Sequence, residues 1–399
     1  AGTIDSEQVQ VLQSALAAIP ATDSPMRARL LAALAAELFW AGDHAERKRL
    51  SDEALGIARR LSDPSTSADV LSARIIAVMA PDTLEERLAN TTELLDVSRQ
   101  LGDPAVAHQA WWVRARSVVE TGDVDEAQRA IDAANRCADE TGQPGLRFVP
   151  AWIGAGLALF AGRMEDAERL TAAILEVGQL TGQRDARQYH ALAQFQLRLE
   201  QGRLDEVEES FTKLSEDFPG LVFVRPMLAL LHCELGQYDE ARARLDALMA
   251  RDLRDLPLDS TWLKSVADCA AVAARLGDAK RAEVLSELLA PYADRLVAAG
   301  GPVIGFVSHY LGLLCTTLRR WEAAENNFSV SDAAHQRAQA PAWLARTRTE
   351  QAAMHLRRGR PDDVATARHL LEGVLSTATD LGFVGVDRRA RALLTEADA

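Results

Sequence analysis

Residues 110–134 read AWWVRARSVVETGDVDEAQRAIDAA and contain the pattern that decides the fold. Apolar residues recur at helical spacing on both sides of Gly122, and Asp123, Asp125 and Glu126 follow the glycine. Glycine often ends a helix because it takes the left-handed backbone conformation at little cost. Acidic residues favour the first turn of the next helix, where the helix dipole is positive. The stretch therefore predicts two helices joined by a tight turn.

The same pattern recurs about every 40 residues, at positions 42, 82, 122, 162, 202, 236, 277, 319 and 359. Most copies keep the glycine, one has Arg319 in its place, and one at Ala80-Pro81-Asp82 is eroded. Aromatic residues make up only 5% of the chain, and no sustained alternation of apolar and polar residues predicts strands. A fixed period of this length is typical of solenoids. We therefore predict an all-α, right-handed α-solenoid of about nine helix pairs.

The repeats fill most of the chain, so we expect a single superhelical domain over residues 1–399. It divides into an N-terminal helix (1–20), repeats (21–383) and a C-terminal capping helix (384–399). The cap helices are expected at Ser6 to Ala18 and at Asp387 to Glu396.

A small residue stands seven positions before most of the repeat glycines and predicts close contact between the two helices of a pair. These residues are Ala35, Ala115, Ala155, Ala229, Ala270, Gly312 and Ala352, and the exception is Phe195. Alanine five positions after the glycine has the same role on the second helix. Enlarging such residues is expected to cost about 1–3 kcal/mol by overpacking.

Charge and cysteine content exclude several classes of function. The chain has 44 Lys and Arg against 58 Asp and Glu, a net charge of −14, which disfavours direct nucleic-acid binding. Its four cysteines, Cys137, Cys233, Cys269 and Cys315, form no CxxC motif, and with no visible signal peptide they fit a reducing cytoplasm. The chain begins at Ala1 without Met, which indicates a processed chain or a fragment.

The longest stretch without charged residues runs from Leu296 to Leu318. Its length is enough to cross a membrane, but Gly300-Gly301-Pro302 and the polar residues Ser308, His309 and Tyr310 interrupt it. We expect a loop followed by a buried helix, and the segment from Val297 to Val307 is the least repeat-like part of the chain.

No motif for catalysis, metal binding or a cofactor is present. There is no Walker A loop, no HExxH and no Gly-x-Ser-x-Gly elbow. The cluster at Gly154 and Gly156 lacks the third glycine of a dinucleotide site and falls inside a predicted helix. We therefore predict no catalytic residue, no metal and no cofactor, with a helical-repeat enzyme built on carboxylate clusters as the remaining alternative.

The pattern resembles the tetratricopeptide repeat. Trp111, Ala115, Gly122, Ala127 and Ala134 match that family's large–small–Gly–Ala–Ala spacing. The period is longer than the usual 34, so extended turns such as those before Pro64, Pro104 and Pro144 are expected between units.

Longer stretches resemble the C-terminal helical-repeat half of large actinobacterial signalling ATPases. They are residues 23–32 (DSPMRARLLA), 219–221 (PGL), 291–295 (PYADR), 310–314 (YLGLL) and 341–347 (PAWLART). That family is similar to the maltose-regulon activator type of LuxR-type transcriptional regulators and includes ATPase-linked adenylate and guanylate cyclases.

The resemblance implies a cytoplasmic, non-catalytic sensory or scaffold module. Such a module binds a protein partner or an effector and regulates a linked ATPase, cyclase or transcriptional output domain. The alternative is a stand-alone tetratricopeptide adaptor that binds peptides or proteins. The oligomeric state stays open.

Solenoids bind partners on the concave face, which the first helices line. In the tetratricopeptide frame, inward positions lie 13, 10, 6 and 3 residues before each repeat glycine. They select Gln109, Trp112, Arg116, Trp152, Tyr189, Phe223, Lys264, Phe306, His309 and Arg346 as candidates for binding a protein, a peptide or a small-molecule effector. Each aromatic residue has core packing as its alternative, and Trp112 is the better groove candidate because Trp111 takes the core position.

The cations on these inward faces, with Arg225 and Arg348, have two interpretations. In the first, they bind an acidic peptide, a terminal carboxylate or an anionic metabolite. In the second, they pair with neighbouring carboxylates of this acidic chain.

Overall fold

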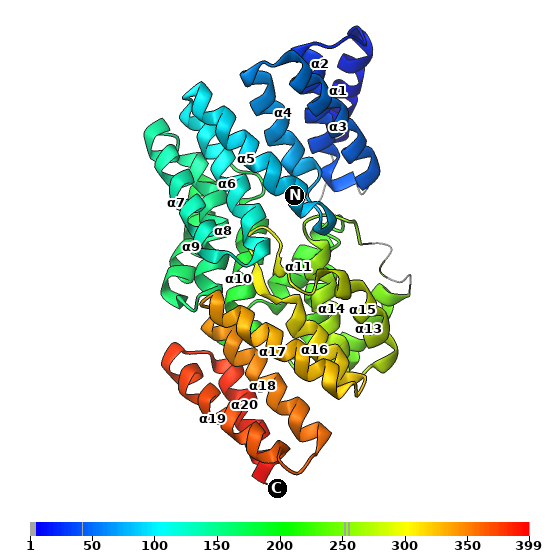
Figure 1. Cartoon of the computed structure of the whole chain (residues 1–399), viewed down its shortest axis with the longest axis vertical. Coiled ribbons are helices and arrows are strands. Elements are labelled where there is room, and N and C mark those ends of the chain that lie inside the picture. Colours follow the sequence, from blue (N-terminus) through cyan, green and yellow to red (C-terminus); the bar gives the residue numbers. More distant parts are fainter. Residues whose placement is uncertain (1–4, 42, 251–252, 254–255, 399) are drawn as a thin grey trace.

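The computed structural model describes residues 5–41, 43–250, 253 and 256–398. Within them, α1 (Ser6–Ala18) precedes nine consecutive helix pairs and α20 (Val384–Asp398) follows them. The chain is an all-α solenoid, as predicted, and its helix pairs run from α2 at the top of Figure 1 to α19 at the bottom.

The nine pairs are α2 (Pro25–Glu37) with α3 (His44–Leu61), α4 (Pro64–Ala77) with α5 (Leu84–Leu101), α6 (Pro104–Val118) with α7 (Val124–Thr141), α8 (Phe148–Phe160) with α9 (Met164–Leu180), α10 (Ala186–Gln201) with α11 (Glu208–Asp217), α12 (Val224–Glu234) with α13 (Tyr238–Met249), α14 (Trp262–Leu276) with α15 (Ala279–Leu289), α16 (Val307–Thr317) with α17 (Trp321–Arg337), and α18 (Pro341–Arg358) with α19 (Asp363–Leu381). Short 3₁₀ turns lie at Leu38–Ala41, Pro81–Thr83, Val119–Thr121, Pro144–Arg147, Leu204–Glu206 and Ala290–Tyr292.

The turns within the pairs confirm the role assigned to the repeat glycines. Gly122 has φ +83°, and Asp123 accepts a hydrogen bond from the Glu126 amide at 2.8 Å, which starts α7. Arg319 keeps the left-handed conformation (φ +56°) without being glycine. The eroded copy at Pro81 is a 3₁₀ turn, and the copy at Gly42 lies outside the described residues.

The small residues before the glycines are buried as expected. Ala115 and Ala270 are fully covered, and a Cβ on Gly312 would lie 2.6 Å from the Phe328 ring. The last unit differs at the position five residues after the repeat glycine. Val364, which occupies that position, is exposed, and Ala367 one turn later is buried instead.

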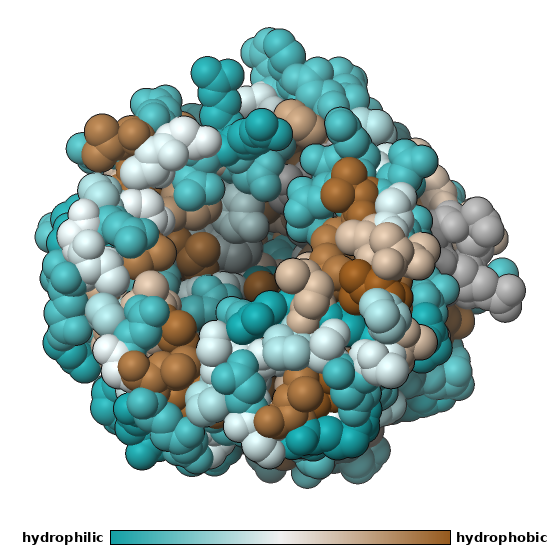
Figure 2. Space-filling model, turned by 90° about the horizontal axis from the view of Figure 1, so that it is seen from above, coloured by the Kyte–Doolittle hydropathy of each residue, from teal (hydrophilic) through white to brown (hydrophobic). Residues whose placement is uncertain are grey.

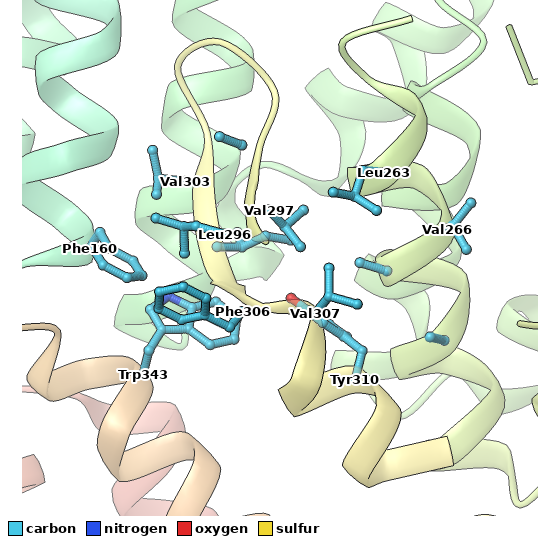
Figure 3. Close-up of a cluster of buried hydrophobic side chains, with 14 of the residues drawn as sticks. Phe160, Leu263, Val266, Leu296, Val297, Val303, Phe306, Val307, Tyr310 and Trp343 are labelled. Atoms are coloured by element: carbon cyan, nitrogen blue, oxygen red, sulfur yellow. The ribbon is translucent and has the colours of Figure 1, made fainter. Parts of the chain in front are cut away.

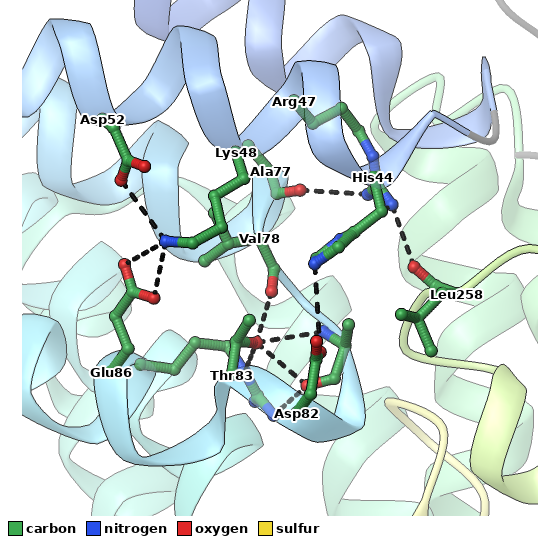
Figure 4. A network of polar contacts seen from close by, with 12 residues as sticks. His44, Arg47, Lys48, Asp52, Ala77, Val78, Asp82, Thr83, Glu86 and Leu258 are labelled. Atoms are coloured by element: carbon green, nitrogen blue, oxygen red, sulfur yellow. Dashed lines mark hydrogen bonds and ion pairs between the residues drawn. The ribbon is translucent and has the colours of Figure 1, made fainter.

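The superhelix is closed by contacts between units far apart in sequence. Arg47, which is fully buried, donates hydrogen bonds at 3.0 Å to the carbonyls of Ala77 and Leu258, so it ties the first unit to the segment before α14 (Figure 4). At the other end, the Arg346 guanidinium on α18 pairs with Glu200 on α10 at 2.8 Å. We call the space that the helices surround the channel, and Figure 2 shows its hollow from the α1–α4 end.

The sequence-based prediction of a loop between Leu296 and Phe306 is wrong. This segment forms an antiparallel hairpin of β1 (Leu296–Ala298) and β2 (Val303–Phe306), and all residues of both strands are buried. Its apolar side chains lie between α8 and α14, as Figure 3 shows for Val303 and Val297. The solenoid therefore contains a two-stranded β element inside its channel.

Candidate functional site

The hairpin sits in the channel because glycines allow its backbone to approach the surrounding helices. A Cβ on Gly156 of α8 would lie 1.7 Å from the carbonyl oxygen of Gly301, and Cβ atoms on Gly300 and Gly301 would each lie 2.2 Å from the Trp152 indole. Glycine is the residue that permits such close approach. Gly154 and Gly156, which fail as a nucleotide-binding motif, lie inside α8, and Gly156 makes room for the hairpin.

On one side of the hairpin tip lies a cavity of about 330 Å³, which we call the upper cavity. Six sequence-predicted residues line it: Trp112, Arg116, Trp152, Tyr189, Phe223 and Lys264. They come from α6, α8, α10 and α14 and from the residue before α12. Inward positions of units far apart in sequence therefore meet at one place, and the volume is in the range of small-molecule pockets.

Aromatic rings form most of the apolar wall of the upper cavity. The Trp152 and Tyr189 rings are in edge contact with centroids 4.4 Å apart, and the Trp40 and Phe223 rings stack at 6.3 Å. Trp112 is 8% exposed, and its indole Nε1 donates to the Gln109 side-chain oxygen at 2.8 Å. Gln109 thus orients the Trp112 ring.

Several lining residues were missed by the sequence analysis. Phe39 and Trp40 come from the 3₁₀ turn after α2, Ser260 and Thr261 from the segment before α14, and Pro302 from the hairpin tip. Only the tip carried a signal, because Gly300-Gly301-Pro302 departs from the repeat. The other four residues lie in segments that connect helices, and the repeat pattern does not predict the path of such segments.

The other predicted residues lie elsewhere. His309 and Arg346 line a second, lower cavity of about 90 Å³, together with Ile304 of β2. Phe306 belongs to the hydrophobic core: its ring lies 5.2 Å from the His335 ring, and a Cβ on Gly122 would come within 2.7 Å of it. For Phe306 the placement favours the packing alternative.

Most of the inward cations pair with carboxylates. The Lys264 ammonium lies 2.5 Å from Asp268, and both side chains are buried. Arg346 pairs with Glu200 at 2.8 Å and Arg348 with Asp332 at 2.6 Å. Burial opposes the charged form of Arg346, but the Glu200 and Glu234 carboxylates with the Tyr310 hydroxyl together outweigh it and raise the pKa of the guanidinium. These cations are neutralised by the protein itself.

Arg116 differs, since no carboxylate of the described residues lies within ion-pairing distance of its guanidinium. It donates to the Ser260 hydroxyl at 3.0 Å and lies 5.8 Å from the centroid of the Trp152 ring, while its Nε has no hydrogen-bond partner. Burial lowers its pKa. Arg116 is a partly buried cation without an ion-pair partner among the described residues, and such a cation attracts an anion placed beside it.

The buried thiols of Cys233 and Cys269 are held in their protonated form. Burial raises the pKa of Cys233 to about 12 and also raises that of the Cys269 thiol, which disfavours the nucleophilic thiolates. In the part of the chain that the structure describes, no three His, Cys, Asp or Glu side chains are grouped as metal ligands would be. No helix there is long and apolar enough to span a bilayer.

Comparisons with known proteins show distant likenesses in structure alone. No protein-family model matches the chain, and no curated protein matches its sequence. The crystal structure of yeast Tom70 is 12% identical with a TM-score of 0.29, over 98% of this chain and 87% of that chain. A circular tandem repeat protein is 15% identical with a TM-score of 0.14, over 94% and 97%. Both scores are too low to transfer any property to this chain.

Proposed function

We propose that the chain is a non-catalytic, tetratricopeptide-like sensory or scaffold module that binds a protein partner or an effector inside its superhelical channel. One observation carries the proposal: inward residues of five units converge on the upper cavity. Concave faces of helical solenoids are their usual binding surfaces. Occupancy of the channel contacts several units at once, so binding is coupled to the relative positions of those units.

The channel gives the proposal a physical route to regulation. The hairpin tip supplies Pro302 to the upper cavity, while β2 supplies Ile304 to the lower one. A ligand that contacts the tip therefore acts on an element that touches α8, α14 and α18. We propose that the whole chain, residues 1–399, transmits this occupancy as a single unit to a linked ATPase, cyclase or transcriptional output domain.

The test uses a photo-crosslinking amino acid at Phe223, which lines the upper cavity, and at Val330, which is 47% exposed on α17. Both variants are expressed in the native host with the full coding sequence. The proposal predicts a defined adduct at Phe223 that is lost when Trp112→Ala is added, and no such adduct at Val330. The same adducts at both positions would contradict it.

The linked output domain is tested separately by the coding sequence upstream of Ala1. A Walker A motif there supports a regulatory module of a signalling ATPase, as the sequence resemblance implies. An upstream sequence without any such domain supports a stand-alone adaptor that binds peptides or proteins.

A further inference from the structure

The charges around Arg116 leave its guanidinium without an ion-pair partner among the described residues. The charged groups that act on it from its surroundings are Arg87, Glu120 and Asp259. Glu120 is committed to Arg87 through two hydrogen bonds of 2.9 and 2.8 Å. Asp259, which is fully buried, also interacts with Arg47. Arg47 is also attracted by Asp43. Arg116 therefore has only carboxylates that also act on another arginine: Glu120 on Arg87 and Asp259 on Arg47.

Asp259 attracts Arg116 through its charge, but no hydrogen bond or ion pair joins the two side chains among the described residues. One of the Asp259 carboxylate oxygens accepts from the amide and the hydroxyl of Thr261, both at 2.7 Å. The other oxygen has no hydrogen-bond partner among the described residues. Burial raises the pKa of this carboxyl group. The cation beside the upper cavity therefore has room for a negative group from outside the chain.

The walls around Arg116 restrict the rest of such a ligand. Trp112, Trp152 and Phe223 are each less than 10% exposed and present rings to the cavity. Flat aromatic groups stack well on such walls. A volume of about 330 Å³ accepts a small molecule and is too small for a folded partner.

We infer that the upper cavity binds a small aromatic carboxylate, an inference that rests on the channel being the binding surface proposed above. Its ring lies among Trp112, Trp152 and Phe223, and its carboxylate accepts hydrogen bonds from Arg116. A guanidinium is suited to this because its planar N–H groups match the two carboxylate oxygens. Lys264 and Glu37 line the same cavity. Asp268 neutralises Lys264, and Glu37 accepts a hydrogen bond from Gln8 at 2.9 Å, so the preference for an anion depends on Arg116.

The test compares 1-naphthoate with its neutral isostere 1-naphthamide by isothermal titration calorimetry on the full chain. We expect naphthoate to bind at least tenfold more tightly. Arg116→Gln should remove that preference and leave the affinity for naphthamide within twofold. The matched control is Arg129→Gln on the exposed surface of α7, which should leave both affinities unchanged.

Arg116→Lys is the second variant, since it keeps the charge and loses the planar fork; it should retain part of the preference. Thermal melting of each variant verifies that it is folded. A preference that survives in Arg116→Gln, or the absence of binding of both probes, would overturn the inference. Equal affinity of wild type for both probes would overturn the anion assignment alone, while the crosslinking result at Phe223 decides the channel proposal independently.

Discussion

Two glycines of α8 offer a direct test of the hairpin's place in the channel. A Cβ on Gly156 would lie 1.7 Å from the Gly301 carbonyl oxygen, whereas a Cβ on Gly154 would meet only the Leu170 side chain at 3.5 Å. Real Cβ contacts are essentially never shorter than 3.0 Å, so in Gly156→Ala the hairpin backbone must move by at least 1.3 Å, the difference between 3.0 and 1.7 Å.

The magnitude follows from two opposing effects. Overpacking costs about 1–3 kcal/mol, and the upper end applies because the neighbour is backbone. Alanine in place of glycine inside a helix gains about 1 kcal/mol. Gly156→Ala should therefore lower the free energy of unfolding by about 2 kcal/mol, while Gly154→Ala should raise it by about 1 kcal/mol.

Urea unfolding followed by tryptophan fluorescence is a suitable assay, because Trp152 and Trp343 contact the hairpin glycines. Hydrogen exchange then localises the effect. The amides of Ala299 in the hairpin turn and of Val307 directly after β2 donate to the Pro302 and Arg295 carbonyls at 2.9 Å, and they should exchange faster only in Gly156→Ala. Equal stabilisation by both substitutions would refute the inserted hairpin.

Three further predictions concern other parts of the chain. Arg319→Gly should raise the melting temperature, because the native φ of +56° costs a non-glycine residue about 1 kcal/mol; Arg320→Gly, at φ −89°, is the control and should lower it. Burial lowers the pKa of His309 to about 3. The unfolded chain therefore binds a proton that the folded chain does not, so the free energy of unfolding should fall as the pH drops below about 6.5, by about 1.4 kcal/mol at about pH 5.5. In His309→Asn the plot of melting temperature against pH should have a shallower slope. An unchanged slope would count against this prediction. Lys264→Met should cost about 3–5 kcal/mol in urea unfolding, because it leaves Asp268 buried and unpaired, and Lys264→Met with Asp268→Leu should recover most of that loss. No recovery would mean that the cost arises from packing.

The sequence predicted the repeat architecture because its signals are local. Gly122 and its counterparts need the left-handed conformation, and Asp123 caps the helix that follows; both effects operate within a few residues. The inward frame is also local, since it follows from helical periodicity, and it selected six residues that meet at the upper cavity.

What the sequence did not predict depends on contacts between distant segments. The hairpin strands are too short for a clear alternation, and their burial comes from α8 and α14. Phe306 has the residue type expected in a groove, but the hairpin carries it into the core. The unpaired state of Arg116, in contrast to Lys264, became visible only once Asp259 and Ser260 were located beside it.

The measurement that tests the central claim most directly is hydrogen–deuterium exchange of the full chain with and without saturating 1-naphthoate. The structure predicts slower exchange in the segments around Trp112, Trp152 and Phe223 and in the hairpin, with little change in the outer helices α7, α9 and α13. Protection confined to those outer helices would contradict a binding site inside the channel.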